Sequence, residues 1–431
     1  MSTFVPIPKK SKSTLRVLHT SDWHLGKRLY NQQRYDEFTH FLDWLINAIN
    51  DNAVDILIVA GDIFDTMTPS NKAQELYYQF LGQVAKSSCH NIVIISGNHD
   101  SPTFLDAPKS ILNALNIKVI GTTSGHIDDE LLILSQDDTP KAIVLAVPYL
   151  RDKDIRNSGS FDDIKNKEHD TIIGIANHYQ TLTNHAKQAQ SDILEKFNKK
   201  IPIIATGHLF VAGSHISSKD DGMRDLYVGT LGQISASIFD DCIDYVALGH
   251  IHAPQRVAEC EHIRYCGSPI AMGFGEIGKT KQVLIVDFNP DHQTTTPSIH
   301  PLAVPVFQML AKITGDWQKI SSELTELMAK NTSIWVEIIY TGQELRPTLT
   351  QDIREFIDGS QILALNIQNR TLHQRVLGSK PKPMNLKQLK ETDIFEQLLT
   401  TKNISSDEKL FLTQAYQALL ADIHHNDHNI D

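Results

Sequence analysis

Residues 55–66 read DILIVAGDIFDT, a short apolar run that ends in a glycine and an aspartate. The run has the length of one buried β-strand, and Gly61-Asp62 after it has the form of a tight turn. A single Gly-Asp pair in this position is usually a turn and nothing more. The same arrangement recurs along this chain, and the repetition is what indicates a fold and a site.

Further apolar runs have the length and the β-branched composition of buried strands. They are Leu15–His19, Ile92–Ser96, Ala142–Val147, Ile173–Ala176, Ile203–Thr206, Tyr245–Leu248 and Val283–Phe288. Amphipathic stretches at Tyr35–Asn50 and Lys72–Ala85 predict helices whose apolar stripes pack on the core. Continuous apolar strands separated by helices predict an α/β fold whose central strands are covered on both faces.

Side chains of metal-ligand type follow several of these strands. They are Asp22 and His24, then Asp62, then Asn98, His99 and Asp100, then His208, and finally His250 and His252. The loops at the carboxyl ends of the strands lie together at one edge of an open α/β sheet, so we expect these side chains to meet in one pocket. Carboxylate, carboxamide and imidazole ligands suit Mn²⁺, Fe²⁺ or Zn²⁺ better than calcium. With Asp62 as a bridging carboxylate, the set predicts a two-ion site that polarises phosphoryl oxygens and activates water.

The composition excludes several classes of protein. The apolar and charged fractions are those of a globular chain, and no uncharged apolar run has the roughly eighteen residues of a membrane span. Residues 1–14 read as a flexible basic N-terminus and not as a secretory signal, which predicts a cytoplasmic protein. The four scattered cysteines form no CxxC pair and indicate reduced thiols, and Cys260 and Cys266 have the wrong spacing for a common zinc site. The net charge of −11 argues against a chain that binds DNA unaided.

The order of the predicted strands and helices and the changes in composition divide the chain into three parts. These are a catalytic region at 15–296, a small α+β module at 297–377 and a C-terminal segment at 378–431. The module has a βαββ-like pattern, in which Asp316 is a good N-cap for the first helix and Thr350–Ile357 is predicted to be a second helix. The C-terminal segment combines a Pro/Lys linker with short helices that either pack on this chain or dock a partner. The docking candidates are Ile394, Phe395, Leu398, Leu399, Leu410, Phe411, Leu419 and Leu420.

The motifs Asp-x-His, Gly-Asp, Gly-Asn-His-Asp, Gly-His and Gly-His-x-His, in this order, resemble the signature of the calcineurin-like metallophosphoesterases. Several longer stretches resemble the exonuclease subunits of bacterial DNA-processing complexes within that family. These are HTSDWHLG (19–26), AGDIFDT (60–66), SGNHDS (96–101), ATGHL (205–209), RDLYVGTL (224–231), YVALGHIH (245–252) and RYCGSP (264–269).

The resemblance implies a four-layer α/β sandwich of two mixed sheets flanked by helices, followed by a small α+β capping domain and C-terminal helices. It implies one ion on Asp22, His24, Asp62 and His252 and a second on Asp62, Asn98, His208 and His250. Mn²⁺ is favoured, with Mg²⁺, Fe²⁺ and Zn²⁺ as alternatives. His99 would act as proton donor or transition-state stabiliser with Asp100 as its orienter. In the archaeal and eukaryotic relatives a histidine stands where this chain has Asp65, so its role does not carry over, and Asp65 either hydrogen-bonds a ligand or caps the turn.

The same resemblance implies a DNA nuclease, a double-strand exonuclease and single-strand or hairpin endonuclease of repair, replication and recombination. Its partner would be a coiled-coil ATPase that supplies DNA-binding surface and ATP-dependent gating, which answers the charge objection. A homodimer would form through the helices near 35–50 and 72–85. Lys27, Arg28 and Arg34 are candidate DNA contacts, although solvated surface charge is the commoner fate of such residues.

Two other functions compete with this interpretation. A phosphomonoesterase or cyclic-nucleotide phosphodiesterase would use the same two-ion site, but it has no need of the capping-like module and apolar tail. A metal-free interaction scaffold on this fold would be expected to lack several ligands, and here the whole set is present. Cleavage of small phosphate esters but not of DNA would favour the first alternative. A metal analysis that finds no tightly bound ion would favour the second.

Overall fold

The computed structural model describes residues 6–155, 164–212, 214, 234–289, 296–344, 346–371 and 413. The chain splits into one compact unit of Met1–Gly342 with Thr348–Gln368 and another of Gln343–Pro347 with Asn369–Asp431. The sheets and helices below belong to the first unit, apart from the last residue of its final strand. The partner-docking candidates from Ile394 to Leu420 and the 224–231 motif lie outside the described residues.

The first sheet has the strand order β12-β11-β1-β2-β3-β4. Its parallel strands are β1 (Leu15–Thr20), β2 (Ile56–Ala60), β3 (Asn91–Ile95) and β4 (Ile117–Ile120). Antiparallel pairing adds β11 (Gln282–Phe288) next to β1, and β12 (Ser298–Ala303) next to β11. The sheet is therefore mixed, and its central strand β2 is apolar throughout because both of its faces are covered.

The second sheet has the order β5-β6-β7-β8-β10-β9. Parallel pairing joins β6 (Thr139–Leu145), β7 (Ile203–His208), β8 (Tyr245–Gly249) and β10 (Cys260–Tyr265). Antiparallel edge strands, β5 (Leu131–Gln136) and β9 (Gln255–Val257), complete it. This sheet is also mixed.

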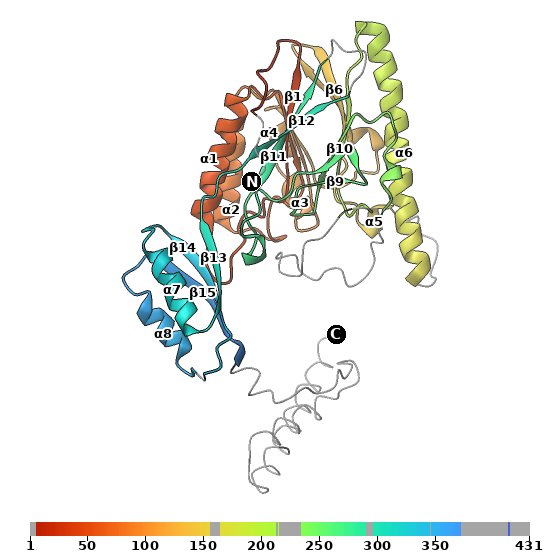
Figure 1. The fold of residues 1–431 in the computed structure, drawn as a ribbon. Helices are drawn as coiled ribbons and strands as arrows, with labels where there is room; N and C mark the ends of the chain where they lie inside the picture. The colour runs from red at the N-terminus through yellow and green to blue at the C-terminus, as the bar shows by residue number, and fades with distance from the viewer. Residues whose placement is uncertain are drawn as a thin grey trace. The chain divides into compact units, whose positions relative to one another are not determined.

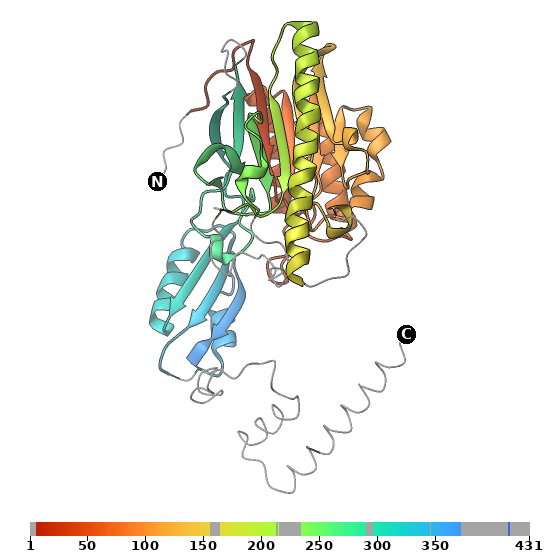
Figure 2. The same ribbon diagram turned by 90° about the vertical axis from the view of Figure 1, so that its right-hand side faces the viewer.

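Helices cover the outer faces of the two sheets, as Figures 1 and 2 show. α1 (Tyr35–Asp51) and α2 (Asn71–Val84) pack on the first sheet, and α6 (Ile164–Phe197) packs on the second. A third apolar cluster fills the space between the sheets. The shorter helices are α3 (Pro102–Asp106), α4 (Lys109–Asn113) and α5 (Asp152–Ile155), with 3-10 turns η1 (Ile127–Asp129), η2 (Ala236–Ile238) and η3 (Phe274–Glu276). The predicted four-layer sandwich is confirmed.

One predicted strand is wrong. The run Ile173–Ala176 lies inside the long helix α6. Ile175, Tyr179 and Leu182 are buried in the second core, whereas Ile173 is 42 % exposed. Burial at spacings of three and four residues is helical, so the tertiary contacts override the β-branched local composition.

The α+β module forms a third sheet in the order β13-β14-β15. Its elements are β13 (Met309–Gly315), α7 (Trp317–Met328), β14 (Ile334–Tyr340), α8 (Leu349–Phe356) and β15 (Ile362–Asn369). The observed order is βαβαβ, and α8 lies where the sequence predicts the second helix of the module, at Thr350–Ile357. The Asp316 side chain caps α7 by accepting the backbone N–H of Lys319, as predicted. Strand β12, which follows the predicted boundary at residue 296, still belongs to the first sheet.

The cysteines in the described part of the chain, Cys89, Cys242, Cys260 and Cys266, are free thiols, as predicted. None of the described helices combines the length and apolar character that spanning a membrane requires.

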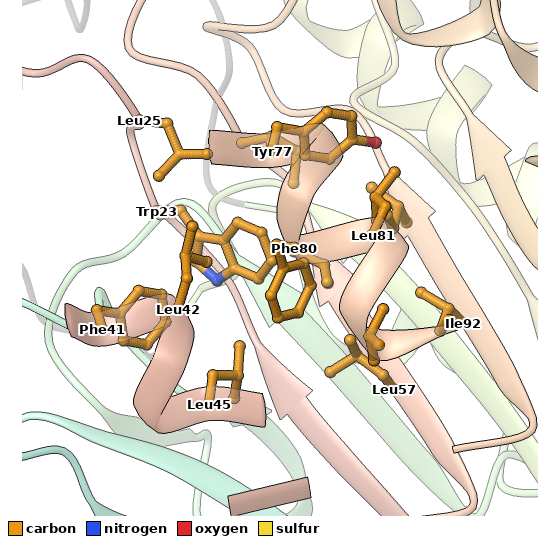
Figure 3. Close-up of a cluster of buried hydrophobic side chains, with 14 of the residues drawn as sticks. Trp23, Leu25, Phe41, Leu42, Leu45, Leu57, Tyr77, Phe80, Leu81 and Ile92 are labelled. Atoms are coloured by element: carbon orange, nitrogen blue, oxygen red, sulfur yellow. The ribbon is translucent and has the colours of Figure 1, made fainter. Parts of the chain in front are cut away.

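Trp23 anchors the loop after β1 in the core between the first sheet and its helices (Figure 3). Its ring meets Phe41 of α1 and Phe80 of α2 edge-to-face, with centroids 5.9 and 5.2 Å apart. The indole N–H donates to Thr20 Oγ1 over 3.0 Å. Because Asp22 and His24 flank it in sequence, this burial also fixes the backbone that carries both side chains.

We expect Trp23→Ala to lower the free energy of unfolding by about 3–5 kcal/mol, since it removes a fully buried ring and leaves a cavity. Trp44→Ala, which truncates a half-buried ring of α1, is the matched control and should cost clearly less. Urea unfolding followed by circular dichroism measures both. Equal losses in the two variants would contradict the anchoring role of Trp23.

Candidate metal centre

The predicted ligand loops meet at one edge of the two sheets. β1, β2 and β3 are neighbours in the first sheet, β7 and β8 are neighbours in the second, and β2 lies against β7 and β8. All five strands therefore deliver the residues at their carboxyl ends to one place.

The loops after β1 and β2 hold each other by backbone hydrogen bonds. The N–H of Asp22 donates to the carbonyl of Gly61, and the N–H of His24 to the carbonyl of Asp62, each over 3.0 Å. Several predicted ligands have left-handed backbone, a conformation that strains residues other than glycine. They are Asp22, His24, Asp62 and His250, with φ of 54°, 48°, 51° and 101°. The loop-to-loop hydrogen bonds hold the strained conformations of the first three in place.

Two glycines are required by close approach. A Cβ on Gly97 would overlap Oδ1 of Asp62, and one on Gly249 would overlap the carbonyl oxygen of Ala60. They make room for a ligand side chain and for the neighbouring sheet.

The first donor set contains Asp22, His24 and His252, whose ligand atoms all lie within 4.8 Å of one another. The Nε2 atoms of His24 and His252 face each other at 3.1 Å. Oδ2 of Asp62 lies 3.5 Å from Nε2 of His24. Nitrogen ligands about 2.0–2.1 Å from a common ion stand about 3.0–3.4 Å apart, so these spacings fit a shared cation.

The second donor set lies on the other side of Asp62. The same oxygen, Oδ2, is 3.3 Å from Nε2 of His208. Oδ1 of Asn98 lies 3.0 Å from that nitrogen and 3.1 Å from Nδ1 of His250. Nδ1 of His208 lies 2.9 Å from the carbonyl of Ala60 and donates to it, which leaves Nε2 as the ligand atom. The ligand atoms of Asp22, Asp62 and His208 also lie within 4.8 Å of one another.

The ionisation of the buried cluster shows that positive charge is stabilised beside Asp62. Burial opposes charge on His208, yet the Asp62 carboxylate raises its pKa to about 9. Burial and then the nearby His208 lower the pKa of His250 to about 3. Burial would raise the pKa of Asp62, but the charge of His208 holds it well below its ordinary value. The Asp62 carboxylate therefore favours positive charge beside it, as a site for a cation requires.

Asp100 has a different contact from the one expected. Its buried carboxylate accepts the backbone N–H groups of Ile63, Phe64 and Gly97 at 3.1, 2.9 and 2.8 Å. Burial and then the charge of Asp62 raise its pKa to about 6, against those three hydrogen bonds. Asp100 therefore ties the loop after β2 to the loop after β3, and the expectation that it orients the His99 ring is corrected.

The His99 ring is positioned by the Asp65 loop instead. Nδ1 of His99 lies 2.9 Å from the carbonyl oxygen of Asp65, which can only accept, so Nδ1 carries hydrogen. The ring lies edge-to-face with His24 at a centroid distance of 4.9 Å. The Asp65 carboxylate lies 3.4 Å from Nδ1 of His24 and 3.0 Å from Nζ of Lys27. Of the two roles left open for Asp65, the contact with a candidate ligand is the one that the geometry supports.

The predicted DNA contacts differ in their exposure. Arg34 is buried, ion-paired to Glu37 at 2.8 Å and hydrogen-bonded to the carbonyl of Ala271, so it cannot reach a phosphate. This corrects the expectation for Arg34. Lys27 is half-buried beside Asp65, and Arg28 is exposed.

A buried ion pair that the sequence did not reveal lies behind His252. Nδ1 of His252 is 3.8 Å from Oε1 of Glu276, and neither of these buried atoms has a hydrogen-bond partner among the described residues. Oε2 of Glu276 contacts Nζ of Lys281 at 2.5 Å and accepts the N–H of Met272. Lys281 also donates to the carbonyl of His252 and to Oγ of Ser268. Glu276 and Lys281 belong to no short sequence motif. The only sign of this ion pair in the sequence is that both charged residues come shortly before the buried strand β11.

Comparison with known proteins agrees with this geometry. The calcineurin-like phosphoesterase family model matches residues 15–254, and the chain belongs to that family. A second match, to the Type 5 capsule protein repressor C-terminal domain, covers residues 306–403.

Within the family, the similar proteins are the D subunits of the SbcCD nuclease, and this chain is one of that group. It is 34 % identical to the SbcCD nuclease D subunit of Escherichia coli (strain K12), over 94 % of this chain and 98 % of that protein. Identity to the protein of the same name from Bacillus subtilis (strain 168) is 32 %, over 65 % of this chain and 68 % of that one. The Rhodobacter capsulatus protein is 32 % identical over 73 % of this chain and 76 % of its own length. The chain is thus a metal-dependent nuclease of the phosphoesterase class.

We predict that Glu276→Gln weakens divalent-ion binding about 10- to 100-fold, because it removes the carboxylate charge that faces the rear nitrogen of His252. Glu261→Gln, an exposed carboxylate on β10, is the control and should leave ion affinity unchanged. Isothermal titration with Mn²⁺ measures the affinity, and thermal unfolding of the ion-free variants reports any loss of packing. Unchanged affinity in folded Glu276→Gln would exclude the positioning role.

Proposed function

We propose that this chain hydrolyses DNA phosphodiester bonds at two ions bound by seven side chains from both sheets. Asp22, His24, Asp62 and His252 hold one ion, and Asp62, Asn98, His208 and His250 hold the other. The main support is the position of Asp62 Oδ2, which lies 3.5 Å from Nε2 of His24 and 3.3 Å from Nε2 of His208. Borderline nitrogen and oxygen donors favour Mn²⁺, with Mg²⁺, Fe²⁺ and Zn²⁺ as competitors.

When bound, the ions supply positive charge to the phosphoryl group and activate the attacking water. The protein adds His99, which lies beside the first donor set against the His24 ring. Nδ1–H of His99 donates a hydrogen bond to the Asp65 carbonyl, so Nε2 is the atom that exchanges a proton with the leaving oxygen. Asp100 keeps the His99 loop in register with the Asp62 loop.

We expect His99→Gln to retain ion affinity but to lose about 100- to 10,000-fold in cleavage rate, the usual contribution of a positioned acid. His185→Gln on the exposed face of α6 is the control. Release of nucleotides from duplex DNA with Mn²⁺ gives the rate, and titration with Mn²⁺ gives the affinity. Wild-type rates in His99→Gln would contradict this role. Wild-type cleavage confined to phosphomonoesters or cyclic nucleotides would favour the small-ester alternative.

The capping domain at 297–377 would position DNA over the ions. It contacts the catalytic domain beside the first ligand loop, where Tyr30 donates to Oε1 of Glu337 over 2.8 Å. Nδ2 of Asn366 donates to the Tyr30 hydroxyl over 2.8 Å. Leu29, Phe274 and Trp335 form a small apolar cluster at the same place. The exposed Arg28 lies in this stretch and remains the DNA-contact candidate, with the half-buried Lys27 next to it.

An SbcC-type coiled-coil ATPase would be the partner, because the relatives are named as subunits of SbcCD. The acidic net charge of −11 also calls for DNA-binding surface from elsewhere. We expect deletion of residues 386–431 to abolish co-purification with the ATPase while Mn²⁺-dependent cleavage of single strands persists. Retained co-purification would place the docking surface in another part of the chain.

We further propose a cytoplasmic homodimer that acts in DNA repair, replication and recombination. Most of the apolar stripe of α1 and α2 is buried in the chain's own core, which leaves the outer side of α2 for self-association. Tyr78 on α2 and Met67 just before it remain 39 % and 57 % exposed. Loss of the dimer in Met67→Glu/Tyr78→Glu, measured by sedimentation, tests this surface.

A further inference from the structure

A cavity of about 370 Å³ lies at the opposite end of the strands from the metal centre. It is lined by residues at the start of β1, before β2, in β6 and before β7, together with the end of β11. Strands of five or six residues at about 3.3 Å each put it roughly 17–20 Å from the ligand loops. It is therefore separate from the site described above.

The lining of this cavity is rich in lysine. Lys10 is neutralised by Asp55 at 2.5 Å, and Asp55 is the one carboxylate among the lining residues. The other lining lysines form no ion pair within the described part of the chain, and they are Lys12, Lys141, Lys199 and Lys200. Burial and then the charge of Lys141 lower the pKa of Lys199. Uncompensated positive charge thus converges here in a chain whose net charge is −11.

Hydroxyl groups of the 10–15 segment hold that part of the lining in place. Ser11 Oγ lies 3.1 Å from Ser13 Oγ and 2.7 Å from Thr14 Oγ1. Thr14 Oγ1 also donates to Asn289 Oδ1 at 2.6 Å, which ties the segment to the end of β11. These hydrogen bonds fix the segment that carries Lys12, and the ammonium groups around the hollow match the oxygens of a multiply charged phosphate.

We propose that this lysine cavity binds a small oligophosphate, such as pyrophosphate or the triphosphate group of a nucleotide. Its volume is in the range of small-ligand sites. The lysines approach it from separate segments around a hollow and do not form the stripe along a surface that tracks a DNA backbone. The ligand is bound by charge, so its affinity falls as salt rises.

The test is isothermal titration of the full chain with pyrophosphate and with inorganic triphosphate. The protein is first freed of divalent ions, so that the metal centre does not compete. Lys141→Gln/Lys199→Gln removes two of the lining charges and should weaken binding at least 10-fold, with the melting temperature of the free protein unchanged. Lys86→Gln/Lys330→Gln, which removes two exposed lysines elsewhere, is the matched control and should bind like wild type.

The proposal is overturned by equal losses in both double variants, because the binding would then be a response to overall charge. Absence of binding to either phosphate in wild type overturns it as well. Duplex DNA is tested as a competitor of pyrophosphate. If DNA displaces pyrophosphate, and if Lys141→Gln/Lys199→Gln weakens DNA binding while the control variant does not, the cavity is part of a DNA-binding surface and the small-ligand assignment is wrong. Nuclease activity enters none of these readouts, so the result does not depend on the proposed function.

Discussion

The Asp62 carboxylate lies where the two sheets meet, and each of its oxygens has a separate contact. Oδ2 faces His24 of the first sheet and His208 of the second, while Oδ1 accepts the backbone N–H of His99. That placement requires a left-handed φ at Asp62 and the absence of a side chain at Gly97. The strained backbone conformation of Asp62 is held in place by hydrogen bonds between the loops and by the buried Trp23 beside them.

Sequence reasoning worked where the signal is local. Each candidate ligand comes directly after an apolar run, and parallel strands bring their carboxyl-terminal loops to a common edge, so the pocket could be predicted without a structure. The same argument failed for Ile173–Ala176, because only the packing of Ile175 and Tyr179 against the second sheet makes that run helical. Sequence reasoning failed for Arg34 as well, because the burial of that side chain and its hydrogen bond to the carbonyl of Ala271 depend on tertiary structure that no short motif encodes.

Side chains around the ligands were the least predictable part. Glu276 is distant in sequence from His252 and lies on an irregular turn, so its position behind that ring follows from the fold alone. Asp100 was recognised as important from its motif, but its contacts are to backbone N–H groups of two loops and not to the neighbouring ring. Motifs identify which side chains matter, whereas the contacts that orient those side chains come from elements far apart in the chain.

The division of the donors between two sheets has a consequence for folding. The loops of β1, β2 and β3 carry Asp22, His24, Asp62 and Asn98, and those of β7 and β8 carry the other histidines, so neither half has a complete set. A folding intermediate with a single formed sheet would bind ions weakly. Cations would then bind late in folding and stabilise only the state in which the two sheets are correctly packed together. Their removal would weaken the contact between the sheets before either sheet unfolds.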